Sequence, residues 1–118
     1  MRILILEDNK FRIEAFRTHL IGTTKDFCTE ASDAIHLLKT NKYDLIMLDH
    51  DLGGEVYVDS NEANTGYQVA KTIPDSINKD TRIIVHSMNP IGAKLMVDTI
   101  GSNAKHVPFC CLNFEDVK

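Results

Sequence analysis

The sequence predicts a doubly wound α/β sandwich whose central layer is a five-stranded parallel sheet. Short apolar runs of strand length alternate with segments in which apolar residues recur at helical spacing. The strongest run, Leu45-Ile46-Met47-Leu48, has no polar alternation, which is typical of a strand buried on both faces. Because strands that alternate with helices pair in parallel through right-handed crossovers, these patterns predict one open parallel sheet.

The first half of the chain is expected to supply two strand–helix pairs. A strand at residues 2–6 precedes a helix that Asn9 caps and Gly22 ends. The apolar positions at helical spacing in this helix are Phe11, Ala15, Phe16 and Leu20. A short edge strand at residues 26–30 precedes a second helix, which Ser32 is expected to cap. The buried stripe of the second helix is Ala34, Ile35 and Leu38.

The central strand at residues 44–48 leads into a long polar loop that ends at Thr65. The loop contains Gly53, Gly54, Asn64 and the apolar island Val56-Tyr57-Val58. Loops of this length in a compact domain are usually functional or mobile. One hypothesis is that the loop is a lid over a binding site, with Tyr57 and Asp59 as its candidate functional residues. The alternative is an ordinary flexible crossover loop.

The second half continues the alternation of helices and strands. A helix is expected at residues 66–73 and a buried strand at residues 82–85. Asn89 caps the next helix, and Gly101 ends it. A last strand is expected at residues 105–109, after which nine residues remain. These suffice for one or two helical turns, so the last helix is expected to be truncated.

Length and composition limit the class of protein. With 118 residues, 43% hydrophobic and 25% charged, residues 1–118 are expected to form a single domain. No apolar run approaches the roughly 20 residues that a membrane-spanning helix needs, and the apolar stretch at residues 3–6 is too short for a signal peptide. We therefore expect a cytoplasmic protein with no membrane partner. The three cysteines match no zinc-site spacing.

Charge limits the kind of ligand. The formal net charge is −4 and there is no basic run, which argues against bulk binding of nucleic acid. A small phosphate-bearing ligand or an RNA end remains open. Between residues 43 and 70 there is no Lys or Arg, but there are six acids: Asp44, Asp49, Asp51, Glu55, Asp59 and Glu62. A local field of this sign attracts cations.

Polar side chains follow three of the predicted strands at their carboxyl ends. Glu7-Asp8 follows the first strand, Asp49-His50-Asp51 the central strand and His86-Ser87 the fourth strand. In open α/β sheets the carboxyl ends of the strands border the ligand-binding crevice. Carboxylates at close range raise one another's pKa unless a cation intervenes, so a bound divalent metal is expected.

Four acids are the candidate metal ligands: Glu7, Asp8, Asp49 and Asp51. Hard oxygen donors suit Mg²⁺ or Mn²⁺, while His50 and His86 within reach also allow a softer transition metal. The alternative is that some of these acids only cap helices or stay solvated, above all Glu7.

The whole chain resembles the receiver domains of two-component response regulators. Glu7-Asp8 matches the acid pair with which receivers bind metal after their first strand. Asp44-Leu45-Ile46-Met47-Leu48-Asp49 matches the strand that ends in their phosphoacceptor aspartate. The resemblance implies the flavodoxin-like doubly wound fold of receivers and gives Asp49 the phosphoacceptor position.

The chain also departs from the receiver pattern. His86 stands where receivers carry a switch threonine or serine, although Ser87 follows. Val107 stands where receivers carry a lysine that pairs with the phosphoryl group, and Lys105 is two residues out of register. Asp51 adds a carboxylate. The last helix, part of the usual receiver dimerisation face, is almost absent, so we expect a monomer or weak dimer.

These departures resemble one particular family, the cyclic-phosphate-processing receiver domains known from phages and bacteria. The matching motifs are Asp49-His50-Asp51-Leu52-Gly53, Thr65-Gly66 and His86-Ser87-Met88-Asn89-Pro90, followed by Gly92-Ala93 and Met96. The resemblance implies a metal-dependent hydrolase of cyclic phosphates or other phosphodiesters, as a hypothesis.

Opening a cyclic phosphodiester requires an activated water, charge neutralisation and a proton for the leaving alkoxide. A metal held by Asp8, Asp49 and Asp51 would supply the first two, and the imidazole of His50 or His86 suits the third. The predicted catalytic residues are thus Asp49, His50 and His86. Amides at the start of the helix after Asn89 are expected to hold a phosphate oxygen. The predicted phosphate-binding residues are Ser87, Asn89, Ile91 and Gly92.

Two non-enzymatic hypotheses compete. In one, the chain is a divergent receiver that accepts a phosphoryl group on Asp49; in the other, it is a non-enzymatic module that works only by binding a partner. The missing lysine and the short last helix count against a phosphorylated receiver. An adaptor that binds no metal would leave the acid cluster without a cation, at a cost in stability.

Overall fold

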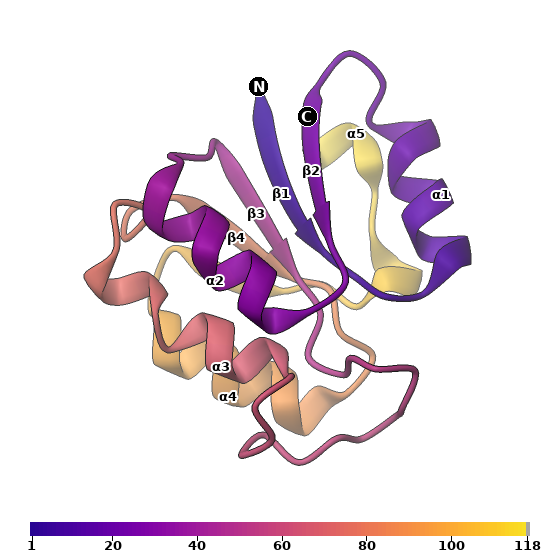
Figure 1. Cartoon of the computed structure of the whole chain (residues 1–118). Helices are drawn as coiled ribbons and strands as arrows, with labels where there is room; N and C mark the ends of the chain where they lie inside the picture. Colours follow the sequence, from indigo (N-terminus) through magenta and orange to yellow (C-terminus); the bar gives the residue numbers. More distant parts are fainter. Residues whose placement is uncertain (118) are drawn as a thin grey trace.

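Five parallel strands form one sheet, as the sequence predicts, and helices cover both faces of the sheet (Figure 1). The computed structural model describes residues 1–117. The strands are β1 (Arg2–Leu6), β2 (Thr24–Cys28), β3 (Leu45–Leu48), β4 (Arg82–Val85) and β5 (Ala104–His106). Their order in the sheet is β2-β1-β3-β4-β5, and every neighbouring pair is parallel. The predicted doubly wound α/β fold is confirmed.

The helices divide between the two faces of the sheet (Figure 1). They are α1 (Lys10–His19), α2 (Ala31–Thr40), α3 (Gly66–Ala70), α4 (Pro90–Ile100) and α5 (Phe114–Val117), with the 3₁₀ turns η1 (Ile73–Asp75) and η2 (Phe109–Cys111). Successive strand side chains point to opposite faces, so β1 and β3 contribute to both halves of the core. One half packs against α2, α3 and α4, and the other against α1 and the C-terminal segment. No helix in residues 1–117 is long and apolar enough to cross a membrane.

Asparagine side chains cap the helices α1 and α4, as the sequence predicts. Asn9 Oδ1 accepts hydrogen bonds from the amides of Phe11 and Arg12, at 3.0 and 3.2 Å. Asn89 Oδ1 accepts one from the amide of Gly92 at 3.1 Å. Both predicted caps are therefore confirmed, and each helix starts directly after a strand end that carries candidate site residues.

The bounds predicted for both edge strands are wrong, and the central strand begins at Leu45 rather than at residue 44. The edge strand predicted at residues 26–30 is β2 at Thr24–Cys28, because it pairs residue by residue with the whole of β1. The strand predicted at residues 105–109 is β5 at Ala104–His106. It ends before Pro108, whose nitrogen has no hydrogen to donate to a neighbouring strand.

The helix predicted at residues 66–73 is shorter than expected. α3 ends at Ala70, and Pro74 lies in the 3₁₀ turn η1. A proline cannot continue an α-helix, because its ring clashes with the preceding turn and it lacks an amide hydrogen. The proline thus ends the α-helix earlier than the apolar pattern indicated.

Two side chains are placed differently from the prediction. Ser32 does not cap α2; instead Asn64, from the long loop, accepts a hydrogen bond from the amide of Ala31 at 2.9 Å. The loop therefore supplies the cap from a distant part of the sequence. Phe11 is 87% exposed, whereas Phe16 is fully buried between α1 and the sheet.

Candidate functional site

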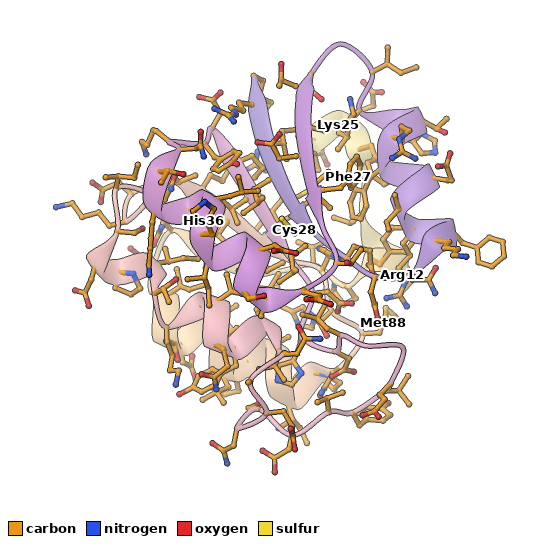
Figure 2. All side chains as sticks on the ribbon, viewed as in Figure 1. Arg12, Lys25, Phe27, Cys28, His36 and Met88 are labelled. Carbon is orange, nitrogen blue, oxygen red and sulfur yellow. The ribbon has the colours of Figure 1, made fainter. Side chains whose placement is uncertain are left out.

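The carboxyl ends of β1, β3 and β4 meet at one edge of the sheet, where the structure has a cavity of about 300 Å³. This cavity, called the cleft below, is lined by Asp8, Asn9, Arg12, Asp49, Asp51, Gly54, Glu55, Val56 and Met88. Arg12 and Met88 lie next to each other at this end of the molecule (Figure 2). Three of the four predicted metal-binding acids therefore line one cleft, and the fourth, Glu7, is fully buried.

Close backbone packing fixes the position of Asp49. The amide of Gly66 donates to the carbonyl oxygen of His50 at 2.9 Å, and Asp51 forms an isolated β-bridge with Thr65. A Cβ atom on Gly66 would lie 1.8 Å from the carbonyl oxygen of Asp49. Only glycine fits this position, which gives the Thr-Gly motif a steric reason.

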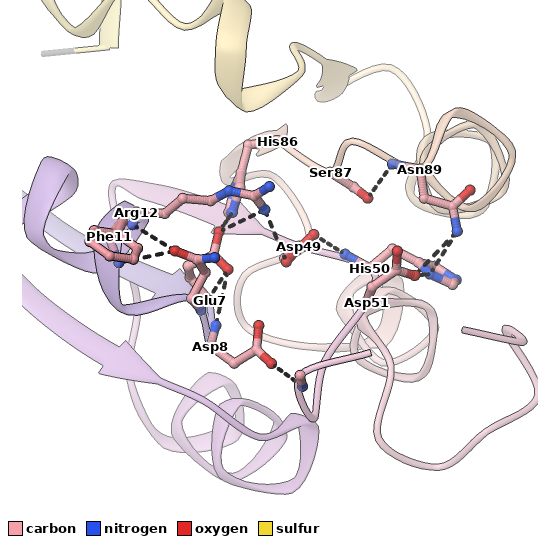
Figure 3. A network of polar contacts seen from close by, with 12 residues as sticks. Glu7, Asp8, Phe11, Arg12, Asp49, His50, Asp51, His86, Ser87 and Asn89 are labelled. Atoms are coloured by element: carbon pink, nitrogen blue, oxygen red, sulfur yellow. Dashed lines mark hydrogen bonds and ion pairs between the residues drawn. The ribbon is translucent and has the colours of Figure 1, made fainter. Parts of the chain in front are cut away.

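Glu7, Asp49 and His86 form a buried cluster beside the cleft (Figure 3). Their ligand atoms all lie within 4.8 Å of one another. Glu7 Oε1 is 3.1 Å from His86 Nε2, and Glu7 Oε2 accepts hydrogen bonds from the amides of Asp8 and Asn9 at 3.0 and 3.1 Å. The other ring nitrogen of His86 is buried and has no hydrogen-bond partner among the described residues. The cluster thus holds two oxygen donors and one nitrogen donor within the span of a metal site.

Arg12 brings positive charge to these acids. Its guanidinium Nη1 lies 3.6 Å from Glu7 Oε1 and 3.9 Å from Asp49 Oδ2, and the side chain is 28% exposed. Both distances are longer than those of hydrogen bonds. Arg12 therefore offsets part of the acidic charge while its exposed side faces the cleft.

The two buried acids of the cluster differ in charge. Burial and the neighbouring Glu7 raise the pKa of Asp49 to about 8. Burial also acts to raise the pKa of Glu7, but the hydrogen bond and charge of His86, the amide of Asn9 and the charge of Arg12 outweigh burial and lower it. At neutral pH the proton of the pair therefore resides on Asp49. A cation bound in the cleft would compete with this proton.

The long loop after β3 is tied to the acids of the cleft. Asp8 Oδ2 accepts a hydrogen bond from the amide of Gly54 at 2.6 Å. Asp51 Oδ2 accepts one from the amide of Tyr57 at 2.8 Å, and Asp51 Oδ1 accepts one from Val58 at 3.1 Å. The loop therefore lies against the cleft, while its role as a lid stays a prediction.

His50 is fully buried, and its ring contacts the cleft residue Asp51. One ring nitrogen lies 2.7 Å from Asp51 Oδ1 and the other 2.7 Å from Ser60 Oγ. A Cβ on Gly92 would lie 2.6 Å from the ring, so the first turn of α4 packs closely on His50. Burial acts to raise the pKa of Asp51, but hydrogen bonds from His50 and from three amide groups outweigh it and lower the pKa. Asp51 is thus an ionised carboxylate whose two oxygens already accept hydrogen bonds.

The predicted phosphate-binding residues after β4 do not line the cleft. Ser87 is buried and its Oγ accepts a hydrogen bond from the amide of Asn89, while the amide of Gly92 already donates to the capping Oδ1 of Asn89. Ile91 is 84% exposed. Met88, which the motif also contains, is the residue of this segment that reaches the cleft. Phosphate binding at the start of α4 therefore stays a prediction.

Four residues of the site were not predicted as site residues from the sequence: Arg12, Met88, Val56 and Ser60. Arg12 lies in the cleft one helical turn beyond Asp8, and that spacing in the first turn of a helix was a readable signal. Met88 and Val56 line the cleft as well, and Ser60 contacts His50. No local pattern marks Ser60, because it meets His50 only through the path of the loop.

The donors that line the cleft fit a hard divalent cation. Asp8 and Asp49 come from adjacent strands, and each accepts one backbone hydrogen bond on a single oxygen, from Gly54 and His50 respectively. Carboxylate oxygens are the ligands that Mg²⁺ and Mn²⁺ prefer. Adding the imidazole of His86 would give a mixed set that suits a softer transition metal.

Structures of receiver domains share this fold. The chain is similar to the receiver domain of a sensor histidine kinase from Pseudomonas aeruginosa PAO1, described with a magnesium ion coordinated in the active site cleft, at 19% identity and a TM-score of 0.74 over 98% of this chain and 89% of that one. A response regulator from Hahella chejuensis has 26% identity and a TM-score of 0.70 over 98% of this chain and 84% of that one.

A response regulator from Burkholderia pseudomallei, described with a phosphorylated aspartic acid, a calcium ion and citrate, has 20% identity and a TM-score of 0.71. The match covers 98% of this chain but only 63% of that one, so this chain spans less than two thirds of that regulator. Among curated protein sequences no match is found.

A family profile described as the cyclic-phosphate processing receiver domain matches residues 2–102. This match covers most of the chain and agrees with the fold and with the three motifs at the carboxyl edge of the sheet. The chain therefore belongs to the cyclic-phosphate processing receiver domain family.

Proposed function

We propose that the cleft hydrolyses a small cyclic phosphate and that it depends on a divalent metal held by Asp8 and Asp49. The observation that carries the proposal is the pairing, in one cavity of about 300 Å³, of two carboxylates from adjacent strands with the guanidinium of Arg12. Carboxylates are metal ligands, and a guanidinium is a phosphate ligand. The family description and the magnesium reported in the cleft of the Pseudomonas receiver support it.

The metal, Mg²⁺ or Mn²⁺ in this proposal, would neutralise charge on the phosphate and lower the pKa of a bound water. Asp8 and Asp49 would hold it. Asp51 was also predicted as a ligand, but both its oxygens accept hydrogen bonds from protein groups. We therefore propose that Asp51 holds the loop and His50 in place rather than the metal.

Arg12 is the residue that we propose to bind the phosphate. Its guanidinium lies near Asp49 without a hydrogen bond to it, and its exposed side lines the cleft. A planar guanidinium can donate two hydrogen bonds to two phosphate oxygens. Arg12 would thereby hold the cyclic ester beside the metal ligands and stabilise the negative charge that develops on the phosphorus oxygens.

His86 would act through Glu7. It contacts Glu7 Oε1 at 3.1 Å and does not line the cleft, so its predicted role as a direct proton donor is not supported by a contact with the cavity. The charge and the hydrogen bond of His86 keep Glu7 ionised. Glu7 in turn raises the pKa of Asp49, which strengthens the demand for a cation at that carboxylate.

The test is hydrolysis of a panel of cyclic nucleotides, 2′,3′-cyclic ones included, with Mg²⁺, Mn²⁺ or Zn²⁺. We expect turnover that disappears in chelator and falls at least about 100-fold in Asp49→Asn and in Arg12→Gln. Asp98→Asn is the matched control, since Asp98 lies on the exposed side of α4 and pairs with Lys94. A zinc preference together with loss in His86→Gln would indicate that His86 joins the metal site.

The competing activity, phosphorylation of Asp49, is tested on the same protein. A small phosphodonor with Mg²⁺ would add one phosphoryl group to a receiver that still accepts phosphate, and Asp49→Asn would abolish the addition. Such labelling without turnover of any cyclic ester would reject the hydrolase in favour of a divergent receiver.

A further inference from the structure

Cys110 and Cys111 are neighbours in the 3₁₀ turn η2, and both residues are exposed. Their Sγ atoms lie 3.7 Å apart, in a contact in which either thiol can donate the hydrogen. The remaining cysteine, Cys28, is buried in the core with residues of α2. The chain thus keeps one thiol away from solvent and places the other two as a pair at the surface.

The turn that carries the pair is anchored to the rest of the domain. The amide of Phe109 donates to the carbonyl oxygen of His86 at 2.9 Å, and the amide of Cys111 donates to that of Pro108 at 2.7 Å. The ring of Phe109 packs edge-on against the buried Phe16, with 5.5 Å between the ring centroids. Because this backbone is already ordered, a ligand that binds both thiols has less conformational freedom to remove.

The separation of the two sulfur atoms matches that of two ligands on one metal ion. A tetrahedral ion with metal–sulfur bonds of about 2.3 Å holds two of its sulfur ligands about 3.8 Å apart. The Sγ atoms of Cys110 and Cys111 are 3.7 Å apart without any ion. A disulfide, in contrast, usually joins Cα atoms at least about 4.4 Å apart, whereas neighbouring residues have theirs about 3.8 Å apart. The geometry of adjacent residues therefore favours a bound ion over a bridge between the two sulfurs.

The chemistry of the donors selects the kind of ion. Thiolates prefer Zn²⁺ and other soft cations to Mg²⁺ and Ca²⁺. The hydrogen bond and the charge of Cys110 raise the pKa of Cys111, and a cation that binds both sulfurs replaces their protons. Within residues 1–117 no third His, Cys, Asp or Glu forms a metal-binding group with the pair. This agrees with a cysteine spacing that matches no closed zinc motif, and it leaves two positions on the ion open to water.

We propose that Cys110 and Cys111 form a two-thiolate site for a soft divalent cation such as Zn²⁺, separate from the cleft. Each thiol releases its proton to solvent as its sulfur binds the ion, and no electron is transferred. Closed zinc sites with four protein ligands are structural, whereas sites with open positions admit further ligands. An ion held by this pair therefore remains accessible to other ligands, which suits uptake and transfer of the ion rather than stabilisation of the fold.

The test is a titration of the reduced protein with Cd²⁺, followed by the ultraviolet charge-transfer absorption of cadmium–thiolate bonds, which carboxylates do not give. We expect one Cd²⁺ per chain and loss of the absorption when Zn²⁺ displaces it. Cys110→Ser and Cys111→Ser should each weaken binding at least about 100-fold, because each removes a direct ligand, a larger loss than that of an outer contact. Asp49→Asn, which changes the acidic cleft, is the control and should leave the absorption unchanged.

Ellman's reagent checks that the thiols are free before the titration: two should react in the folded protein and Cys28 only in denaturant. The proposal would be overturned by folded, reduced protein that gives no absorption, or by absorption that persists in the Cys110→Ser, Cys111→Ser double variant. One Cd²⁺ for every two chains would also overturn it, because the ion would then lie between two copies. Since the readout needs no phosphate ester, it is independent of hydrolysis in the cleft.

Discussion

At the amino ends of the strands a buried polar residue has all its partners, whereas at the carboxyl ends buried acids face one another. Asn78 is fully buried near the start of β4. Its Oδ1 accepts hydrogen bonds from the amide of Tyr43 at 2.9 Å and from Thr81 Oγ1 at 3.2 Å. Its Nδ2 donates to the carbonyl oxygens of Leu38 and Asn41 at 3.0 and 2.8 Å. This residue joins three segments of chain with no polar atom left over.

The carboxyl edge is built in the opposite way. Glu7 and Asp49 are both buried. Near neutral pH Asp49 holds a proton, because burial and the ionised Glu7 beside it raise the pKa of Asp49. Buried His86 has one ring nitrogen without a partner in the described chain. The same sheet thus has one edge whose polar groups are fully paired and one edge where buried acids lie close together, an arrangement that is typical of functional sites and costs stability.

The largest effect is expected where the carboxyl edge is packed as tightly as a core. Gly66→Ala would place a Cβ 1.8 Å from the carbonyl oxygen of Asp49. We expect the free energy of unfolding to fall by at least about 3 kcal/mol in urea titrations. Gly22→Ala is the control, because a Cβ there meets nothing within 4 Å and only the positive φ costs energy, about 1 kcal/mol. Equal losses in the two variants would contradict this.

Asn78→Ala tests the amino edge. The variant leaves two carbonyl oxygens and the amide of Tyr43 buried without their partner. We expect the free energy of unfolding to fall by about 2–3 kcal/mol. Asn61→Ala, at an exposed asparagine on the loop, should change it by less than about 0.5 kcal/mol. A loss below about 1 kcal/mol in Asn78→Ala would remove the contrast between the two edges.

Asp49→Asn should raise the free energy of unfolding, whereas the two preceding variants lower it. Asp49 binds its proton up to a pKa of about 8 in the folded protein, against 3.8 as its ordinary value. Between these two pH values the folded state holds more protons than the unfolded state, so stability falls as pH rises. Without metal, the variant should be more stable than the wild type by about 2 kcal/mol at pH 8, with a smaller difference at pH 5.5.

The measurement is thermal and urea unfolding at pH 5.5, 7 and 8 in chelator, with Asp98→Asn as the control at an exposed acid. A stability of Asp49→Asn that falls below the wild type at every pH would mean that the Asp49 carboxylate is well solvated or paired without metal.

The smallest effect concerns metal binding. A cation that binds only the folded state at ten times its Kd stabilises it by about 1.4 kcal/mol. We expect Mg²⁺ or Mn²⁺ to raise the Tm of the wild type accordingly and to leave Asp8→Asn and Asp49→Asn unchanged. The same Tm rise in Asp8→Asn would place the metal on Glu7, Asp49 and His86 instead.

The sequence was sufficient for the fold because each strand and helix carries its own local signal. The run Leu45–Leu48 forms the central strand, and Asn9 and Asn89 cap the helices they were expected to cap. Errors arose where a distant segment decided the outcome. Asn64 caps α2 in place of Ser32, a contact across 33 positions in the chain that no local pattern contains.

The sequence predicted most of the acids that gather at the site, but only part of how they are arranged. Because parallel strands end at a common edge, the acids after β1 and β3 had to meet, and Asp8, Asp49 and Asp51 do line one cleft. Which acid faces the cavity, which is buried and which is already paired depends on burial and on hydrogen-bond partners. Those partners come from other elements, as with Arg12 on α1.

By itself, the sequence determined the doubly wound sheet, the edge at which the site lies and the acids gathered there, since all three follow from periodicity and from residues next to strand ends. Only the tertiary structure decided that His86 contacts Glu7 and that His50 lies between Asp51 and Ser60. The path of the loop after β3 brings Ser60 to His50, and the packing of the strands brings His86 to Glu7. Such contacts depend on distances between segments, which no spacing along the chain encodes.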